Sequence, residues 1–198
     1  LPSMDAASVS GYTGAASYSV PIWTPAGPGG LQPSLALNYN SQVIDAGTIL
    51  SQASWVGMGW SLELGSIERN MGKPDSGIED DTFSLQLNGI SSLLLAGTDG
   101  YYHTTDESFY RIQGYNINAI DGDISNSYWV VQDKTGNSYY FEHHARYAYY
   151  DYNSYFDECR GAHQRVWRWS LTRVVNPFGK TLNYGYASEQ KSIQFECK

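Results

Sequence analysis

The stretch YSVPIWTPAGPGGLQPSLALNYNSQ (Tyr18–Gln42), followed by WVGMGWSLELGSIERN (Trp55–Asn70), decides the fold. In the first part, large apolar residues alternate with small or polar ones on both sides of a Pro/Gly cluster. This is the pattern of two half-buried strands joined by a turn. In the second part, glycines stand between bulky residues, which favours a bulge or a close approach of two backbones. No side chain in either part is placed as a nucleophile, a base or a metal ligand, so the stretch predicts scaffold.

Further alternating segments follow, and most are paired around turn sequences. Asn88-Gly89 is a hairpin signal between two of them, and Asp133 and Asn176 each stand three residues before a glycine between aromatic strands. About ten short strands result, at the spacing typical of sandwiches and barrels. We therefore predict an all-β fold, either an antiparallel β-sandwich or a curled, open barrel-like sheet built from hairpins. The strands expected are 17–22, 31–39, 61–69, 83–87, 90–96, 101–103, 109–112, 128–132, 138–142, 166–174 and 180–186.

The domain organisation follows from local composition. Residues 1–16 are small and polar, which predicts a flexible lead-in. Residues 17–198 are expected to form a single β domain. Within it, residues 143–163 are low in aliphatic residues and dense in tyrosine, so we interpret them as a long insertion and not as a core strand. Residues 73–81 are interpreted as an acidic surface loop.

Bulk charge and hydropathy exclude two classes of partner. The formal net charge is −8 and the pI is near 4.8, whereas a phosphate-binding surface needs clustered Lys and Arg, so nucleic acid is not expected. No run of about 18 apolar residues predicts a membrane span. The first residues lack the basic and apolar regions of a signal peptide, and the absence of an initiator Met indicates a fragment or a processed product. Charged residues are only 16%, and Tyr, Gly, Ser and Asn replace them, a composition typical of secreted β-proteins.

The two cysteines, Cys159 and Cys197, leave two states open. They form one disulfide if the compartment is oxidising, or they remain two buried thiols.

Several motifs together resemble the N-terminal domain of the family that includes SpvB and the B component of insecticidal toxin complexes. The resemblance rests on the hairpin Tyr18–Ser41, the "G-x-G-W-x-L" strand from Gly57, the "I-x-R" strand ending at Arg69 and the segment Asp80–Gly89, which resembles the family's "D-x-D-x-F" segment. The closing segment Trp167–Tyr186 is similar to the Rhs/YD repeat, although Asn176 replaces its Asp and Lys180 replaces its Asn.

The resemblance implies a structural role in a larger bacterial toxin. In that family such segments begin a β-sheet shell that encloses or carries a C-terminal payload, and enzymatic activity lies in a separate C-terminal domain. The expected partners are therefore the remainder of a larger toxin or shell polypeptide, or a translocation partner protein. No cofactor is expected, and the expected location is outside the bacterial cell.

Candidate sites for metals or catalysis are outweighed by plainer readings. Asp121, Asp123 and Ser125 resemble the start of a calcium loop, but the sixth and twelfth positions lack the required Gly and Glu, so a polar hairpin loop is favoured. The adjacent histidines His143 and His144 would point to opposite faces of a strand and could not easily bind one zinc ion. Carboxylates at 79–81 offer no raised-pKa pocket for glycoside hydrolysis. We therefore predict that the chain is not an enzyme.

The aromatic residues support an alternative function, a secreted carbohydrate-binding module. A pyranose presents an apolar C–H face that suits an indole or phenol ring, and tyrosine hydroxyls can bond sugar hydroxyls. Because Trp167 and Trp169 stand two apart, they are expected to share one face of a strand. Exposed aromatic patches often mark binding. The candidate binding residues are Tyr147, Tyr149, Tyr150, Tyr152, Tyr155, Trp167 and Trp169.

Overall fold

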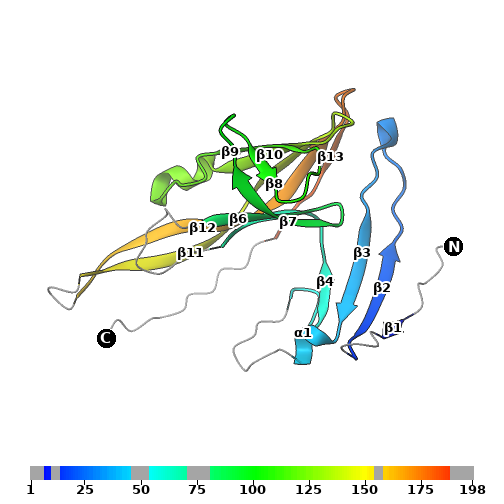
Figure 1. The fold of residues 1–198 in the computed structure, drawn as a ribbon, viewed down its shortest axis with the longest axis horizontal. Coiled ribbons are helices and arrows are strands. Elements are labelled where there is room, and N and C mark those ends of the chain that lie inside the picture. Colours follow the sequence, from blue (N-terminus) through cyan, green and yellow to red (C-terminus); the bar gives the residue numbers. More distant parts are fainter. Residues whose placement is uncertain (1–6, 10–13, 46–53, 71–80, 154–157, 188–198) are drawn as a thin grey trace. The chain divides into compact units, whose positions relative to one another are not determined.

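A computed structural model describes residues 7–9, 14–45, 54–70, 81–153 and 158–187; for 148–153 and 158–162 it describes the backbone alone. The chain divides into two compact units, Leu1–Leu64 and Gly65–Lys198. Each unit holds one antiparallel sheet, and Figure 1 shows the strands of both. The predicted all-β antiparallel fold is thus confirmed. Among the described residues, no helix has the length and apolar character needed to cross a membrane.

The first unit is a four-stranded sheet in the order β1-β2-β3-β4. The short β1 pairs with β2 within the segment that was expected to be a flexible lead-in. Strand β3 begins at Leu35 and not at Leu31, because the intervening Pro33 cannot donate to a ladder. The elements are β1 (Ser8–Val9), β2 (Ala16–Ile22), the 3₁₀ turn η1 (Pro28–Gly30), β3 (Leu35–Asn40), α1 (Gln42–Asp45) and β4 (Trp60–Leu62).

Aromatic side chains share one row across this first sheet. Tyr18 of β2 pairs with Tyr39 of β3, which pairs with Trp60 of β4. The neighbouring row, Ser19–Asn38–Ser61, is polar. The alternation that predicted two half-buried strands therefore sets the register of this sheet. None of the described side chains between residues 7 and 64 is fully buried.

The second unit is a closed barrel. Its strands follow the order β11-β10-β9-β8-β7-β6-β5-β12-β13, and an additional pairing of β11 with β12 closes the first eight into a ring. Strand β13 is attached to β12 outside that ring. The strands are β5 (Ser66–Asn70), β6 (Thr82–Leu87), β7 (Ile90–Ala96), β8 (Tyr102–Thr104), β9 (Arg111–Tyr115), β10 (Tyr128–Gln132), β11 (Ser138–Asn153), β12 (Glu158–Val175) and β13 (Thr181–Asn183), with a 3₁₀ helix η2 (Asp121–Asn126) between β9 and β10.

Aromatic rings fill the middle of the barrel. Phe83 lies 5.0 Å from Trp129, and Trp129 lies 6.0 Å from Trp169, both centroid to centroid and edge to face. Trp129 and Trp169 have no exposed surface. Such edge-to-face pairs suit the ring quadrupole and add to the free energy of burial. The surrounding buried aliphatic residues are Ile67, Leu85, Leu87, Leu94, Ile112, Val131, Val166, Leu171 and Val174.

A glycine interrupts the strand that the sequence predicted over 61–69. β4 ends at Leu62 and β5 begins at Ser66, with the boundary between the two units at Leu64 and Gly65. Gly65 has φ +121°, and a Cβ there would lie 3.2 Å from Leu87 and 3.3 Å from Leu171. A larger residue would therefore be strained and crowded, which is why glycine suits this position.

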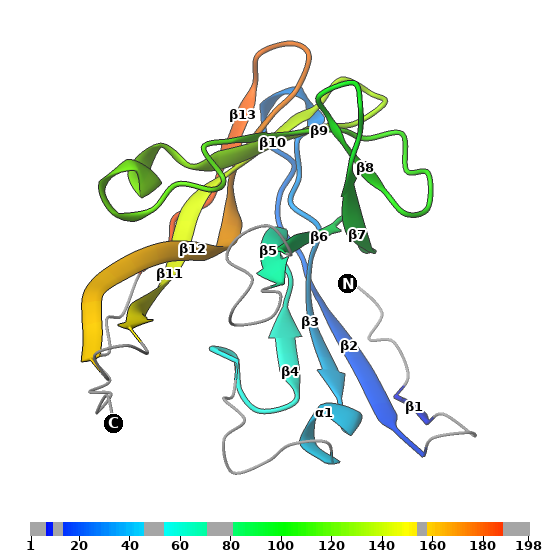
Figure 2. The same ribbon diagram turned by 60° about the vertical axis from the view of Figure 1, so that its left-hand side comes forward.

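Residues 143–163, interpreted from the sequence as an insertion, carry the continuation of the two longest strands. β11 and β12 pair antiparallel from Ser138↔Val175 to Asn153↔Glu158, with register shifts along the way. Figure 2 shows the two strands running side by side beyond the rest of the barrel. The tyrosine-rich segment is thus the outer part of a β-hairpin in the described backbone.

Candidate functional site

A buried ion pair lies inside the barrel. Nη1 of Arg69 is 2.6 Å from Oδ2 of Asp81, and the side chains are 0% and 4% exposed. Arg69 also donates from Nε to the carbonyl of Val166 at 3.0 Å and from Nη2 to the carbonyl of Ile117. A buried charge is tolerable only when it is paired and hydrogen-bonded in this way.

The guanidinium of Arg69 also lies over two neighbouring aromatic rings. Its guanidinium carbon lies 5.0 Å from the Phe83 ring centroid and 5.6 Å from that of Trp169. Asp81 was expected in an acidic surface loop; that expectation is wrong for this residue, because Arg69 draws its carboxylate into the interior. The "I-x-R" and "D-x-D-x-F" motifs therefore supply the two partners of one contact. Carboxylate and guanidinium are thus paired inside the barrel, where the arginine also bonds two backbone carbonyls.

Two turns at one end of the barrel have the same pattern of hydrogen bonds. In the β10–β11 turn, the N–H of Asp133 donates to Asn137 and the N–H of Gly136 donates to Asp133. The side-chain Oδ1 of Asp133 accepts from the N–H of Thr135 at 2.8 Å and from that of Asn137 at 3.0 Å.

The β12–β13 turn repeats this pattern with Asn176 in the place of the aspartate. Its N–H donates to Lys180, its carbonyl accepts from Gly179, and its Oδ1 accepts from Phe178 at 3.0 Å and Lys180 at 2.8 Å. The two turns are also neighbours, because a Cβ placed on Gly136 would lie 3.0 Å from Pro177. The echo between the two sequences is thus a repeated hairpin turn. The mechanism is the one predicted: an Asx side chain caps the turn and Gly takes positive φ, +86° and +73°.

Ionisation differs between the two turns because only one has a carboxylate. Burial opposes ionisation of Asp133, but hydrogen bonds from Thr135 and Asn137 outweigh it, so its pKa is lowered. The hydroxyl of Tyr139 donates to Asp133 at 3.1 Å. Burial, with a contribution from the nearby carboxylate, raises the pKa of Tyr139 to about 12. At neutral pH Asp133 is therefore a carboxylate and Tyr139 a neutral phenol, and their hydrogen bond holds the turn against β11.

The outer edge of β13 is an open sheet edge among the described residues. β13 pairs with β12 through Thr181, Leu182 and Asn183, and it stands last in the strand order. The N–H groups of Asn176 and Tyr184 bond across this pair to Lys180 and Thr172. By the alternation of antiparallel ladders, the N–H and C=O of Asn183 then point away from β12. This edge can accept a further strand.

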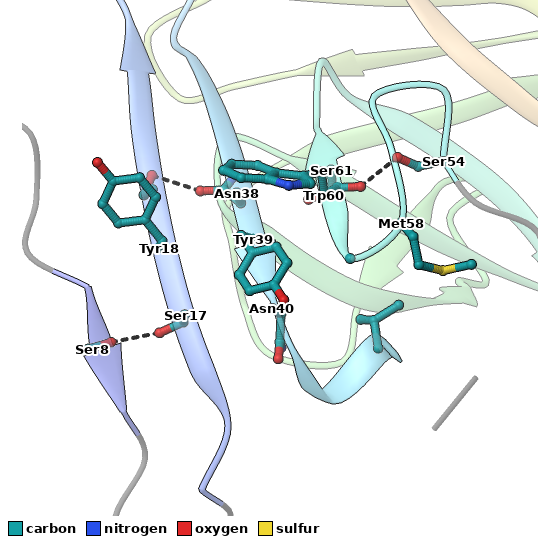
Figure 3. A pocket seen from close by; sticks show the side chains of 13 residues that line it. Ser8, Ser17, Tyr18, Asn38, Tyr39, Asn40, Ser54, Met58, Trp60 and Ser61 are labelled. Carbon is teal, nitrogen blue, oxygen red and sulfur yellow. Dashed lines mark hydrogen bonds between the residues drawn. The ribbon is translucent and has the colours of Figure 1, made fainter. Parts of the chain in front are cut away.

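A pocket of about 810 Å³ opens on the first unit. Figure 3 shows the aromatic residues Tyr18, Tyr39 and Trp60 among its walls, together with small polar side chains. The rings of Tyr39 and Trp60 lie 5.2 Å apart and are tilted by 49°. The sequence reasoning passed over this site. The pairing of Tyr18 with Tyr39 around the predicted hairpin was the signal that could have found it.

The predicted aromatic surface is divided by a bulge. Ala145 pairs with Arg168 but Arg146 pairs with Val166, so Trp167 is the extra residue of β12. The alternation shifts there: Val166 and Trp169 both point inward, and Trp167 stays 36% exposed. The expectation that Trp167 and Trp169 share a face is therefore wrong, and the buried Trp169 cannot contact a sugar.

The other predicted site residues are placed less completely. Tyr147 is half-buried, whereas the side chains of Tyr149, Tyr150, Tyr152 and Tyr155 lie outside the described part. A disulfide between Cys159 and Cys197 also lies outside it. These residues stay predictions.

The calcium candidate occupies the helix η2. The carboxylate of Asp121 accepts bonds from His163 Nδ1 and from the N–H of Gln164, both at 2.8 Å, which lowers its pKa. Within the described ranges, no three His, Cys, Asp or Glu side chains gather as a metal site. The carboxylate of Asp121 thus connects η2 to β12.

Solved structures share this fold, among them the following two. The Photorhabdus luminescens Tc holotoxin pore, in a mutant form, matches with a TM-score of 0.57 and 21% identity over 97% of this chain and 9% of that one. The N-terminal domain of effector protein SpvB from Salmonella typhimurium strain LT2 matches with a TM-score of 0.52 and 22% identity over 86% of this chain and 55% of that one. This chain therefore spans only part of either protein. No curated protein matches.

The family assignment rests on the sequence itself. Residues 10–196 match the family described as the Salmonella virulence plasmid 65kDa B protein, which covers nearly the whole chain. The motifs that carried the resemblance also form the hairpin of the first sheet and the buried pair of Arg69 and Asp81. The chain belongs to the SpvB family.

Proposed function

We propose that this chain is a non-catalytic structural module of a secreted bacterial toxin of the SpvB, Tc and Rhs type. It contributes the first strands of a β-shell that carries or encloses a C-terminal payload. Its partners are the rest of the toxin polypeptide or a translocation partner protein.

One observation carries the proposal, the open edge of β13. A sheet edge with outward N–H and C=O groups is a template for another strand. Asn183 presents these groups, and it lies on the strand that leaves the repeated Asx-Gly turn. A further hairpin of the same kind, as in a YD-repeat shell, would continue the sheet from there. The similarity to a toxin pore of which this chain covers 9% supports the larger assembly.

A pair of proline variants tests the edge. Asn183→Pro removes an outward N–H, so it should leave this module folded and block the added strand. Leu182→Pro removes an N–H on the side of β12 and should instead loosen β13 itself. The readout is protease protection of the C-terminal region in the complete polypeptide, with electron microscopy of the shell.

The expected result is that Asn183→Pro exposes the payload region to protease while the circular dichroism of the isolated module is unchanged. Full protection and an intact shell in that variant would contradict the role of this edge. The complete reading frame gives a separate check, because the proposal expects YD repeats beyond Lys198 in the same polypeptide or its partner.

The predicted alternative is a carbohydrate-binding module using the surface from Tyr147 to Phe156 with Trp167 or Trp169. Of these two tryptophans, only Trp167 is exposed. A glycan array with Trp167→Ala and Tyr150→Ala tests that surface. Array binding that both substitutions abolish would favour it over the shell role.

A further inference from the structure

The pocket of the first unit is built around a row of three rings. Tyr18, Tyr39 and Trp60 occupy one row across β2, β3 and β4. Neighbouring strands lie about 4.8 Å apart, so the row presents ring surface over roughly 10 Å. All three side chains are half-buried, which leaves part of each ring open to a ligand.

The rings are held in place by their surroundings. Gly59 lies against the Tyr39 ring so closely that a Cβ there would come within 2.9 Å of it and within 3.0 Å of Ile44. Gly59 also has φ +77°, which favours glycine. On the other side, Tyr39 contacts Trp60 at 5.2 Å between ring centroids. A ring fixed before binding loses little conformational entropy when a ligand arrives.

The remaining walls are polar but uncharged. Ser8 and Ser17 are joined by a hydrogen bond of 2.6 Å, and Ser19 donates to Asn38 at 2.8 Å. Because these side chains alternate with Tyr18 and Tyr39 along β2 and β3, they point to the other face of the sheet. None of the described side chains that line the pocket is a Lys, Arg, His, Asp or Glu; the full lining is Ser8, Ser17, Tyr18, Ser19, Asn38, Tyr39, Asn40, Val43, Ser54, Met58, Gly59, Trp60 and Ser61.

We propose that this pocket binds a neutral oligosaccharide. The apolar C–H face of a sugar ring stacks on Trp60 and Tyr39, and its hydroxyls bond the hydroxyls of Tyr18 and Tyr39, which lie in the same row. The volume of about 810 Å³ falls within the range of ligand pockets. The absence of charge among the lining residues disfavours phosphate, sulfate and uronic acid groups, and so does the net charge of −8. The site lies in the first unit, and its argument is independent of the β13 edge.

Titration with defined sugars tests the site. The probes are cellotetraose, maltotetraose and tri-N-acetylchitotriose, with a heparin tetrasaccharide as the acidic comparison, followed by calorimetry and by tryptophan fluorescence. At least one neutral probe should bind, and the acidic one should not. Trp60→Ala should weaken that binding about tenfold, the effect of losing one stacked ring.

Matched variants separate stacking from misfolding. Trp23→Ala removes a tryptophan that is 71% exposed and outside the pocket, and it should bind as the parent does. Trp60→Phe keeps an aromatic face and should retain most of the affinity, while Tyr18→Phe tests the hydroxyl alone. Absence of binding for all three neutral probes would overturn the proposal. So would equal losses in Trp23→Ala and Trp60→Ala, or preferential binding of the acidic sugar.

Discussion

Arg69 makes a buried ion pair and two hydrogen bonds to backbone carbonyls inside the barrel. Arg69→Met would remove the buried cation that faces the Asp81 carboxylate, so the free energy of unfolding should fall by about 3–5 kcal/mol. Chemical denaturation measures this loss. The double variant Arg69→Met, Asp81→Leu removes both charges of the pair, so part of the lost stability should return.

A surface pair is the control for the buried one. Arg173 lies 3.1 Å from Glu142, and the side chains are 39% and 41% exposed. Water screens such a pair, so Arg173→Met should cost about 1 kcal/mol or less. Equal losses in the Arg69 and Arg173 variants would contradict the structural role given to the buried pair.

Asp133 makes one turn sensitive to acid. Its pKa is lowered in the folded chain, so the unfolded chain binds the proton more readily. The stabilisation is therefore present above the unfolded value of about 3.9 and is lost as the pH falls through the lower folded-state pKa. Asp133→Asn, which copies Asn176 of the sister turn, should reduce the difference in unfolding free energy between about pH 7 and pH 3. Identical pH profiles for the variant and the parent would show that this carboxylate is not responsible.

At the scale of the element, the bulge in β12 decides which tryptophan belongs to the core. Trp169 is buried and donates from Nε1 to Ser127 Oγ at 3.0 Å. Trp169→Ala should lower the free energy of unfolding by about 3–5 kcal/mol. Trp167→Ala, on the bulge, should change it by about 0.5 kcal/mol. Thermal and denaturant unfolding of the two variants side by side measure the difference, and a larger cost at Trp167 would mean that the register is misassigned.

At the scale of the whole molecule, the two units differ in burial. The barrel encloses its own aromatic core, whereas the first sheet has no fully buried side chain among its described residues. A sheet without a core cannot offset its conformational entropy. The fragment 65–198 should therefore unfold cooperatively on its own, and the fragment 1–64 should not. Circular dichroism during thermal unfolding distinguishes them, and a sharp transition in 1–64 would refute the inference.

The sequence alone determined the local elements of this protein. The alternation around 18–39 gave the first hairpin, and the Asx-Gly turns at Asp133 and Asn176 appear where their side-chain chemistry predicted. These features depend on interactions between residues a few positions apart, so a short stretch of sequence is enough to predict them. The family motifs also included Arg69 and the segment before Phe83, but they did not predict the ion pair between Arg69 and Asp81.

Only the tertiary structure decided which of these elements close on one another. The pairing of β11 with β12 closes the barrel, whereas the sequence left a sandwich and a curled, open barrel-like sheet as alternatives. The bulge at Trp167 places Trp169 in the core. Asp81, which was expected in a surface loop, is buried in an ion pair with Arg69. Each outcome depends on contacts that a short stretch of sequence does not show. The bulge at Trp167 arises in the pairing of β12 with β11, and Asp81 is buried because it pairs with Arg69, which also bonds Val166. Alternation predicts which face a residue lies on only up to a bulge, which shifts the alternation by one residue. The local sequence here does not show where the bulge lies.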